Sequence, residues 1–198
     1  LNKEEHVGIV GQNGTGKSTL IKLSTGQLLP DDGRVTWQSK TSIGYLDQYA
    51  EINLQLDMKS FLKTAFLNLY DLEEKMNYLY ENMQEGDFQN LNTAARYQEE
   101  LERQDFYLID TKIEQVATGL GLAIGLDRPI AQMSGGQRAK VILAKLLLEK
   151  PDVLLLDEPT NFLDKEHVDW LSEYLCGLNN AFMVVSHDYA FLEKISNR

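Results

Sequence analysis

Near the amino terminus, glycines, a lysine and a serine stand in a spacing that suits phosphate binding. Gly11 is followed after four residues by Gly16, and Lys17 and Ser18 come next. Glycines let backbone N–H groups converge on phosphate oxygens where a Cβ atom would obstruct them, and a helix that starts there points its positive end at the anion. Lys17 would add a positive charge and Ser18 a hydroxyl for Mg²⁺. A glycine turn before a helix is the alternative, but the full pattern between a strand and a helix favours a phosphate-binding P-loop.

Two carboxylates follow a short apolar run later in the chain. Val153–Leu156 is entirely apolar, as is typical of a buried parallel strand, and Asp157 and Glu158 come directly after it. A carboxylate at the end of such a strand lies at the crevice of an α/β sheet, where ligands bind. Asp157 is therefore a candidate Mg²⁺ ligand, and Glu158 a candidate to orient or deprotonate an attacking water. A strand that simply ends in charged residues is the alternative, which the phosphate loop makes unfavourable.

A second possible anion site precedes a predicted helix over Ser134–Lys150. Ser134 is a typical N-cap residue, and Gly135 and Gly136 would leave backbone N–H groups accessible at the positive end of the helix, with Gln137 next. An ordinary capped helix explains the same residues. Physical reasoning alone leaves both interpretations open.

The elements that must position these residues alternate between strands and helices, which predicts an α/β fold with a helical insertion. A change in composition marks the insertion: over Glu51–Gln115, apolar residues recur at helical spacing, and 14 acidic residues stand against 6 basic ones. We expect residues 1–49 and 131–198 to form the α/β core and 50–130 to form an acidic helical lobe. Strands are expected at His6–Val10, Arg34–Trp37, Ser42–Leu46, Val153–Leu156 and Ala181–Val185, helices at Leu20–Leu28, Ser134–Lys150 and Lys165–Leu178, and a loop at Gly119–Pro129.

Length and composition exclude several classes of protein. The 198 residues suffice for one domain, and 43% apolar residues indicate a buried core. Cys176 is the only cysteine, which excludes a disulfide scaffold, and no apolar run reaches the ~18 residues of a membrane span. The net charge of −11 opposes strong nucleic-acid binding by this chain alone. Without a visible signal peptide, we expect a cytoplasmic protein, or a piece of one.

The motifs together resemble the ATPase domain of the ATP-binding-cassette (ABC) family, over nearly the whole chain. The resemblance implies an α/β fold with a P-loop NTPase core, a parallel sheet, a small antiparallel β part and a helical subdomain insertion. Its implied assignments are Walker A over Gly11–Thr19, the Q-loop glutamine Gln48, the signature Ser134–Gln137, Walker B with the catalytic glutamate over Val153–Glu158, the D-loop aspartate Asp164 and the switch histidine His187.

These assignments imply ATP and Mg²⁺ as cofactors and give the candidate site residues. Candidate catalytic residues are Glu158, His187 and Gln48, and candidate metal ligands are Ser18, Gln48 and Asp157. ATP-binding residues are expected to be Gly11, Asn13, Gly14, Thr15, Gly16, Lys17, Ser18 and Thr19. The resemblance adds Asp164 and the signature residues Ser134, Gly135, Gly136 and Gln137, and it implies that the signature faces the phosphate loop of a second cassette.

The stretch Glu158–Asp164 is similar to the F subfamily of ABC proteins, although Phe162 stands where His is usual and Tyr189 where Arg is usual. The resemblance implies the first cassette of a soluble twin-cassette protein that acts on ribosomes in translation or antibiotic resistance, without direct membrane contact. Hydrolysis would require pairing with a second cassette. The alternatives are the ATPase subunit of a membrane transporter and a non-hydrolysing nucleotide switch.

Overall fold

The computed structural model describes residues 1–12, 14–46, 52–84, 87–122 and 125–197. Its centre is a parallel sheet with the strand order β1-β4-β3-β2. Ile9 and Asp157 both pair with Val185, so the carboxyl ends of β1, β3 and β4 lie at one edge of the sheet. That alignment brings the segments that follow β1 and β3 together. The strands are β1 (His6–Ile9), β2 (Ile43–Tyr45), β3 (Val153–Asp157) and β4 (Ala181–Val185).

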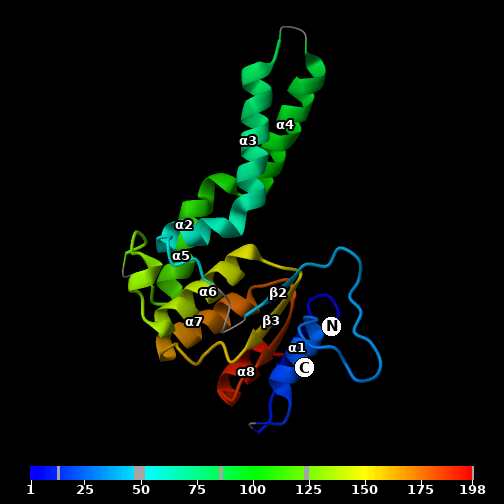
Figure 1. Ribbon diagram of the computed structural model, residues 1–198, viewed down its shortest axis with the longest axis vertical. Coiled ribbons are helices and arrows are strands. Elements are labelled where there is room, and N and C mark those ends of the chain that lie inside the picture. Colours follow the sequence, from blue (N-terminus) through cyan, green and yellow to red (C-terminus); the bar gives the residue numbers. More distant parts are fainter. Residues whose placement is uncertain (13, 47–51, 85–86, 123–124, 198) are drawn as a thin grey trace.

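Helices cover both faces of the sheet (Figure 1). Leu154 and Leu156 of β3 belong to the large hydrophobic cluster that includes side chains of α6, α7 and α8, whereas Val153 and Leu155 pack with Ile21 of α1. Alternate residues of β3 are thus buried on opposite faces, which explains why a parallel strand is apolar throughout. The helices are α1 (Lys17–Ser24), α6 (Gly135–Glu149), α7 (Lys165–Cys176) and α8 (Tyr189–Ile195).

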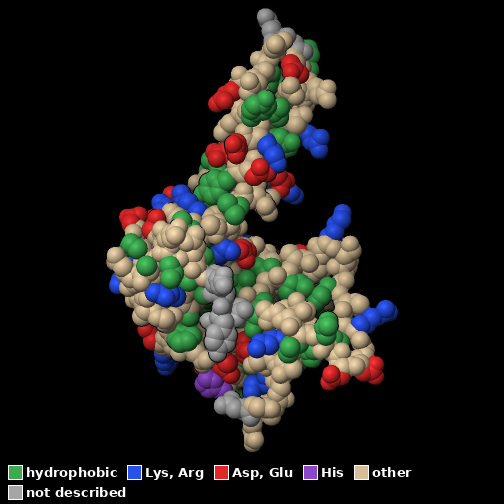
Figure 2. All heavy atoms as spheres, in the orientation of Figure 1, with side chains coloured by type: hydrophobic (Ala, Val, Ile, Leu, Met, Phe, Trp, Pro, Cys, Tyr) green, Lys and Arg blue, Asp and Glu red, His purple; other side chains and the backbone are tan. Residues whose placement is uncertain are grey.

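The predicted lobe is helical, and part of it projects from the rest of the molecule. Figure 1 shows α3 and α4 as an antiparallel hairpin that rises away from the sheet, and acidic side chains lie along it in Figure 2. The base of the lobe shares the large hydrophobic cluster with α6 and α7. Its helices are α2 (Met58–Lys63), α3 (Leu67–Asn82), α4 (Phe88–Arg103) and α5 (Ile109–Gly119), with single 3₁₀ turns at Thr64–Phe66 and Phe106–Leu108 and a further turn at Ile130–Gln132.

In the part of the chain that the structure describes, one expected strand does not form, and the strands make no small antiparallel β part. Arg34–Trp37 is described but forms no strand, and the neighbouring β2 pairs in parallel with β3. Strand-forming residue types need a partner for the hydrogen-bond ladder, and the described residues offer none there. Trp37 is held instead by its indole N–H, which donates to the Ser24 carbonyl at 2.8 Å. The only antiparallel pairing among the described residues is the isolated bridge between Asp57 and Pro129.

The remaining predicted elements agree with the structure to within a few residues. Ala181–Val185 is a strand as predicted, and the predicted strand at Val153–Leu156 extends to Asp157. The first helix begins at Lys17, inside the glycine loop, and ends at Ser24, so it is shorter and lies earlier in the chain than the predicted Leu20–Leu28. Within the described part of the chain, no helix has the length and apolar character that crossing a bilayer requires.

Candidate functional site

The glycine-rich loop connects β1 to α1 and has the backbone that phosphate binding needs. Gly14 and Gly16 have φ of 84° and 92°, a region that side chains disfavour. A Cβ atom on Gly11 would lie 2.9 Å from the Thr15 hydroxyl oxygen. The Lys17 ammonium donates to the carbonyl oxygens of Gly11 at 2.8 Å and Gln12 at 3.0 Å. Lys17 therefore folds back across its own loop; Asn13 lies outside the described residues.

The loop and the end of β3 line one cleft of about 350 Å³. The phosphate-loop residues and the two carboxylates, 140 residues apart in sequence, meet there because β1 and β3 both flank β4. The backbone of Val185 at the end of β4 completes the wall, a residue that motif analysis did not single out because valine carries no chemical signal. The cleft is lined by Gly14, Gly16, Lys17, Ser18, Thr19, Asp157, Glu158 and Val185.

Glu158 is held at the rim of this cleft by both its backbone and its side chain. Its φ is 51°, uncommon for a residue with a side chain, and its N–H donates to the Val185 carbonyl at 2.8 Å. Its Oε2 atom lies 2.8 Å from Nδ1 of His187 and accepts a 3.4 Å bond from the His187 backbone N–H. The two candidate catalytic residues are thus paired directly, with the Glu158 side chain 19% exposed and that of His187 71% exposed.

The sequence motifs identify Glu158 and His187 separately as candidate catalytic residues, and they do not predict a contact between the two side chains. Both follow the ends of adjacent strands, β3 and β4, whose register aligns Asp157 with Val185. Adjacent strand ends were the available signal, but strand order is not visible in a single sequence. The pairing gives Glu158 a neighbour that can hold its carboxylate in place or exchange a proton with it.

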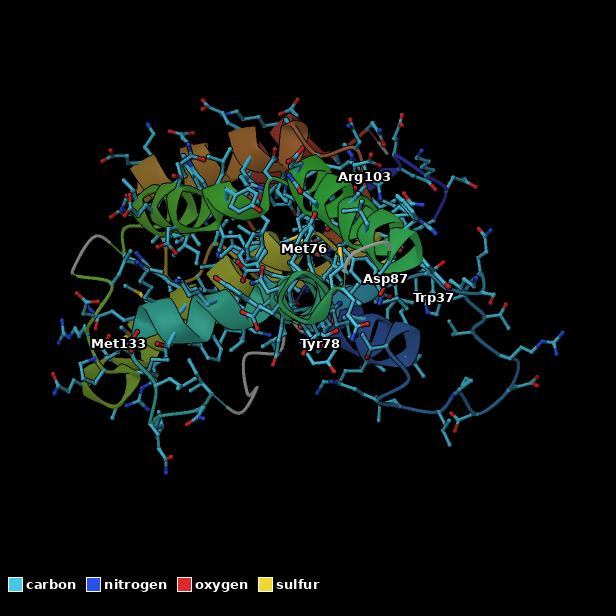
Figure 3. All side chains as sticks on the ribbon, turned by 90° about the horizontal axis from the view of Figure 1, so that it is seen from above. Trp37, Met76, Tyr78, Asp87, Arg103 and Met133 are labelled. Atoms are coloured by element: carbon cyan, nitrogen blue, oxygen red, sulfur yellow. The ribbon has the colours of Figure 1, made fainter. Side chains whose placement is uncertain are left out.

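The signature residues form a capped helix start that does not line this cleft. The Ser134 hydroxyl accepts from the Gln137 N–H at 3.3 Å, while the Gln137 side chain accepts from the Ser134 N–H at 3.0 Å. This reciprocal capping box fixes the first turn of α6. In Figure 3, Met133, next to the signature, lies on the opposite side of the molecule from Trp37. Ser134 and Gly135 are exposed, and none of Ser134–Gln137 lines the cleft beside the phosphate loop.

Asp164 stands apart from the cleft. Asp164 is the N-cap of α7, where its carboxylate accepts from the His167 N–H at 3.3 Å, and it does not line the cleft. Gln48 lies outside the described residues. The structure thus brings together Lys17, Ser18, Asp157 and Glu158, with His187 attached through Glu158, and leaves Ser134–Gln137 and Asp164 elsewhere.

The residues of the cleft fit a magnesium-bound nucleoside triphosphate. Ser18 and Asp157 contribute a hydroxyl and a carboxylate, the hard oxygen ligands that Mg²⁺ prefers, beside the Lys17 ammonium. Mg²⁺ is commonly held by one or two protein side chains together with phosphate oxygens. The backbone of the glycine loop supplies the accompanying cradle for phosphate.

Comparison with known proteins gives a consistent assignment. Residues 1–161 match the family described as ABC transporter. The chain is 48% identical over 202 residues to the uncharacterized ABC transporter ATP-binding protein YfmM of Bacillus subtilis, covering all of this chain and 39% of YfmM. It is 37% identical to the tylosin resistance ATP-binding protein TlrC of Streptomyces fradiae, covering 99% of this chain and 37% of TlrC. It thus spans well under half of these relatives.

A third relative and a solved structure extend this result. The chain is 34% identical to the energy-dependent translational throttle protein EttA of Mycobacterium tuberculosis, covering 96% of this chain and 34% of EttA. The fold matches the archaeal ribosome recycling factor aABCE1, solved in complex with the ribosomal stalk protein aP1, with a TM-score of 0.68, 24% identity, and coverage of 99% of this chain and 31% of that protein. Because the family match spans most of its length, the chain belongs to the ABC family, whose ATP-binding domains are ATPases.

Proposed function

We propose that this chain is a cassette that binds Mg-ATP and hydrolyses it when paired with a second cassette. The observation that carries the proposal is the single cleft in which Lys17, Ser18, Asp157 and Glu158 meet. Lys17 and the loop N–H groups would bind the phosphates, and Ser18 and Asp157 would hold Mg²⁺. Bound Mg²⁺ would neutralise charge that develops on the phosphate oxygens during transfer.

Glu158 is the proposed group that acts on the attacking water. It lies at the rim of the cleft, and its Oε2 is bonded to His187 Nδ1 at 2.8 Å. A carboxylate fixed in this way can accept the proton of a water beside the terminal phosphate, while His187 orients it and is available to contact that phosphate. Gln48 is proposed to complete the metal environment.

The exposed signature supports the requirement for pairing. Ser134–Gln137 forms a capped helix start with exposed Ser134 and Gly135, yet it does not line the cleft of its own chain. In a head-to-tail pair, it would bind the ATP held by the phosphate loop of the other cassette, with Asp164 at the same contact. Binding of ATP would close the pair and hydrolysis would reopen it.

A Glu158→Gln variant tests this assignment. The amide keeps the shape of the side chain but cannot accept a proton, so ATP binding should persist while turnover by the full-length protein falls at least about 100-fold. Glu193→Gln, an exposed carboxylate on α8, is the matched control and should leave both unchanged. Near-normal turnover of the Glu158 variant would remove the residue from the chemical step.

We propose that the whole protein belongs to the F subfamily and acts on ribosomes, and that this chain is its first cassette. The similarity to a translational throttle protein and to a tylosin resistance protein supports this proposal. The family description and the transporter name of YfmM favour a second candidate, the ATPase subunit of a membrane transporter.

Co-sedimentation separates the two candidates. The full-length Glu158→Gln protein with ATP should pellet with ribosomes, because ATP would hold its cassettes closed. This chain alone, with a net charge of −11, should remain in the supernatant at about 150 mM salt, because repulsion from phosphate opposes binding. Copurification of the full-length protein with an integral membrane partner, without ribosome binding, would instead support the transporter role.

A further inference from the structure

The short loop between β4 and α8 carries His187, and its backbone is fixed at both ends. At one end, the carbonyl oxygen of Val185 accepts a 2.8 Å bond from the Glu158 N–H. At the other end, Asp188 begins α8, where its carboxylate accepts a 3.0 Å bond from the Phe191 N–H. Only two residues separate these fixed points, and His187 is one of them.

The other residue of this loop, Ser186, ties its two ends together through its side chain. Ser186 is fully buried, and its Oγ atom accepts a hydrogen bond from the Asp188 N–H at 3.1 Å. Serine hydroxyls form this kind of turn with the backbone two residues on. The bond spans His187, so it restricts the backbone conformation from which the His187 ring extends.

A second buried hydroxyl, on Thr160, lies against Ser186 from the neighbouring turn. Thr160 is 8% exposed, and its Oγ1 atom lies 3.5 Å from Oγ of Ser186. This distance is long for a bond between hydroxyls, so the bond to Asp188 is the stronger constraint. The turn of Thr160 begins at Glu158, whose carbonyl accepts from the Asn161 N–H at 3.3 Å. The two hydroxyls therefore lie between the turn that carries Glu158 and the loop that carries His187.

The contact between His187 and Glu158 depends on the direction of this loop. Both Nδ1 and the backbone N–H of His187 meet the same Oε2 atom of Glu158, at 2.8 Å and 3.4 Å. Two bonds from one residue to one oxygen require its backbone to face that oxygen. The His187 side chain is 71% exposed, so packing contributes little to its orientation.

We propose that Ser186 is a positioning residue that orients His187 toward Glu158, and that Thr160 supports the Ser186 hydroxyl. Ser186 does not line the cleft, so it would act on the reaction through His187 alone. The inference rests on the proposed function, because that function assigns Glu158 and His187 to the chemical step.

Substitutions of the two hydroxyl residues separate orientation from general stability. Ser186→Ala removes the hydroxyl that spans His187, and Thr160→Val removes only the supporting hydroxyl while keeping a branched side chain. Ser172→Ala is the matched control, because Ser172 is also buried, at 1% exposed, and its hydroxyl donates to the Val168 carbonyl within α7. If Ser186→Ala yields no folded protein, Ser186→Cys takes its place, since a thiol is a weak acceptor.

The NMR signal of the His187 ring, in histidine-labelled full-length protein without nucleotide, measures its orientation. His187→Gln identifies the signal by its absence, and Glu158→Ala shows where the signal lies when the ring has lost its partner. Ser186→Ala should move the signal toward that position, Thr160→Val should move it less, and Ser172→Ala should leave it in place. This measurement needs no ATPase activity. It therefore stays decisive even if the wild-type protein fails to hydrolyse ATP, a result that would contradict the proposed function alone.

Turnover per bound nucleotide then tests what the orientation does for the reaction. Ser186→Ala should lower kcat about fivefold, the loss expected for one hydrogen bond, with the KM for ATP unchanged. Ser172→Ala should keep kcat per bound nucleotide, because its lost bond lies within α7. An unmoved His187 signal in Ser186→Ala, an unchanged kcat in that variant, or equal effects in Ser172→Ala would overturn the proposal.

Discussion

The α/β core and the helical lobe use their residues in opposite ways. The core places charged and hydroxyl side chains at the carboxyl ends of strands, where Lys17, Ser18, Asp157 and Glu158 share one cleft. No described residue of the lobe lines that cleft. The lobe instead combines a buried apolar side, continuous with the hydrophobic cluster under the sheet, with an acidic surface.

The candidate reacting groups thus belong to the core, and the lobe differs from the core in how its residues are held. Strand ends and a glycine loop fix reacting groups through the backbone, with little freedom, whereas the long α3–α4 hairpin makes most of its contacts with itself. The lobe still meets the core at defined positions, one of which is where the Trp170 ring of α7 covers Gly119 at the end of α5. Variants of the residues that line the cleft should therefore change nucleotide binding or turnover, whereas variants elsewhere should act through stability or through coupling between the regions.

The largest expected effect is the loss of nucleotide binding in Lys17→Ala. The ammonium is the one cationic side chain that lines the cleft among the described residues, so its removal should weaken ATP binding at least about 100-fold. Lys75→Ala on the hairpin is the control, because the ion pair of Lys75 with Asp71 is exposed. Isothermal titration with Mg-ATP measures both; equal affinities would contradict the division between core and lobe.

A second pair of variants compares burial in the two regions. Leu156 of β3 is fully buried and Leu67 of α3 is 62% exposed. Leu156→Ala should lower the free energy of unfolding by about 2–5 kcal/mol, because it leaves a cavity, while Leu67→Ala should cost less than about 0.5 kcal/mol. Urea denaturation followed by circular dichroism gives both values. Similar losses would contradict the difference in burial between these two positions.

A third variant tests the contact between the lobe and the core, where α5 packs against α7. In Gly119→Ala the new Cβ atom would overlap the Trp170 ring, so the two helices must move apart at a cost of about 1–3 kcal/mol. Gly135→Ala is a suitable control for stability, because nothing lies within 4 Å of a Cβ atom at that position. Thermal unfolding of the two variants should differ clearly; equal melting temperatures would show that α5 and α7 separate without cost.

How far the sequence predicted the structure also differs between the regions. In the core, continuous apolar runs and the glycine pattern located β3, β4 and the phosphate loop, because burial and phosphate binding each restrict residue type. In the lobe, helical periodicity indicated helices but gave neither the hairpin nor its direction. Those depend on packing between distant segments, which leaves no local pattern.

The errors and omissions have the same physical origin. Arg34–Trp37 has strand-forming residues, yet without a neighbouring ladder it stays irregular. The pairing of Glu158 with His187 and the cover of Gly119 by Trp170 both join residues from different elements. Gly119 and Gly121 predicted only a loop. In the structure, Gly119 leaves room for the Trp170 ring of α7, and Gly121 leaves room for the His167 ring.

The smallest expected effect is a change in how the free energy of unfolding depends on pH in variants of Asp110 and Asp152. In the lobe, hydrogen bonds from Lys59 and then Lys63 lower the pKa of Asp110; in the core, bonds from the Ser42 backbone and hydroxyl lower the pKa of Asp152. A lowered pKa in the folded state contributes stability above the ordinary value of 3.8 and loses it as the pH falls below that value. Acid titration by circular dichroism should therefore show a shallower loss of stability in Asp110→Asn and Asp152→Asn than in the wild type.

The dependence of ATP turnover on protein concentration tests the central claim most directly. The cleft holds the phosphate loop and Glu158, but Ser134–Gln137 of the same chain lies elsewhere, and we propose that a second cassette completes the site. The steady-state rate of this chain alone should be low and should rise faster than linearly with its concentration. Strong turnover from a verified monomer, strictly proportional to concentration, would contradict the account.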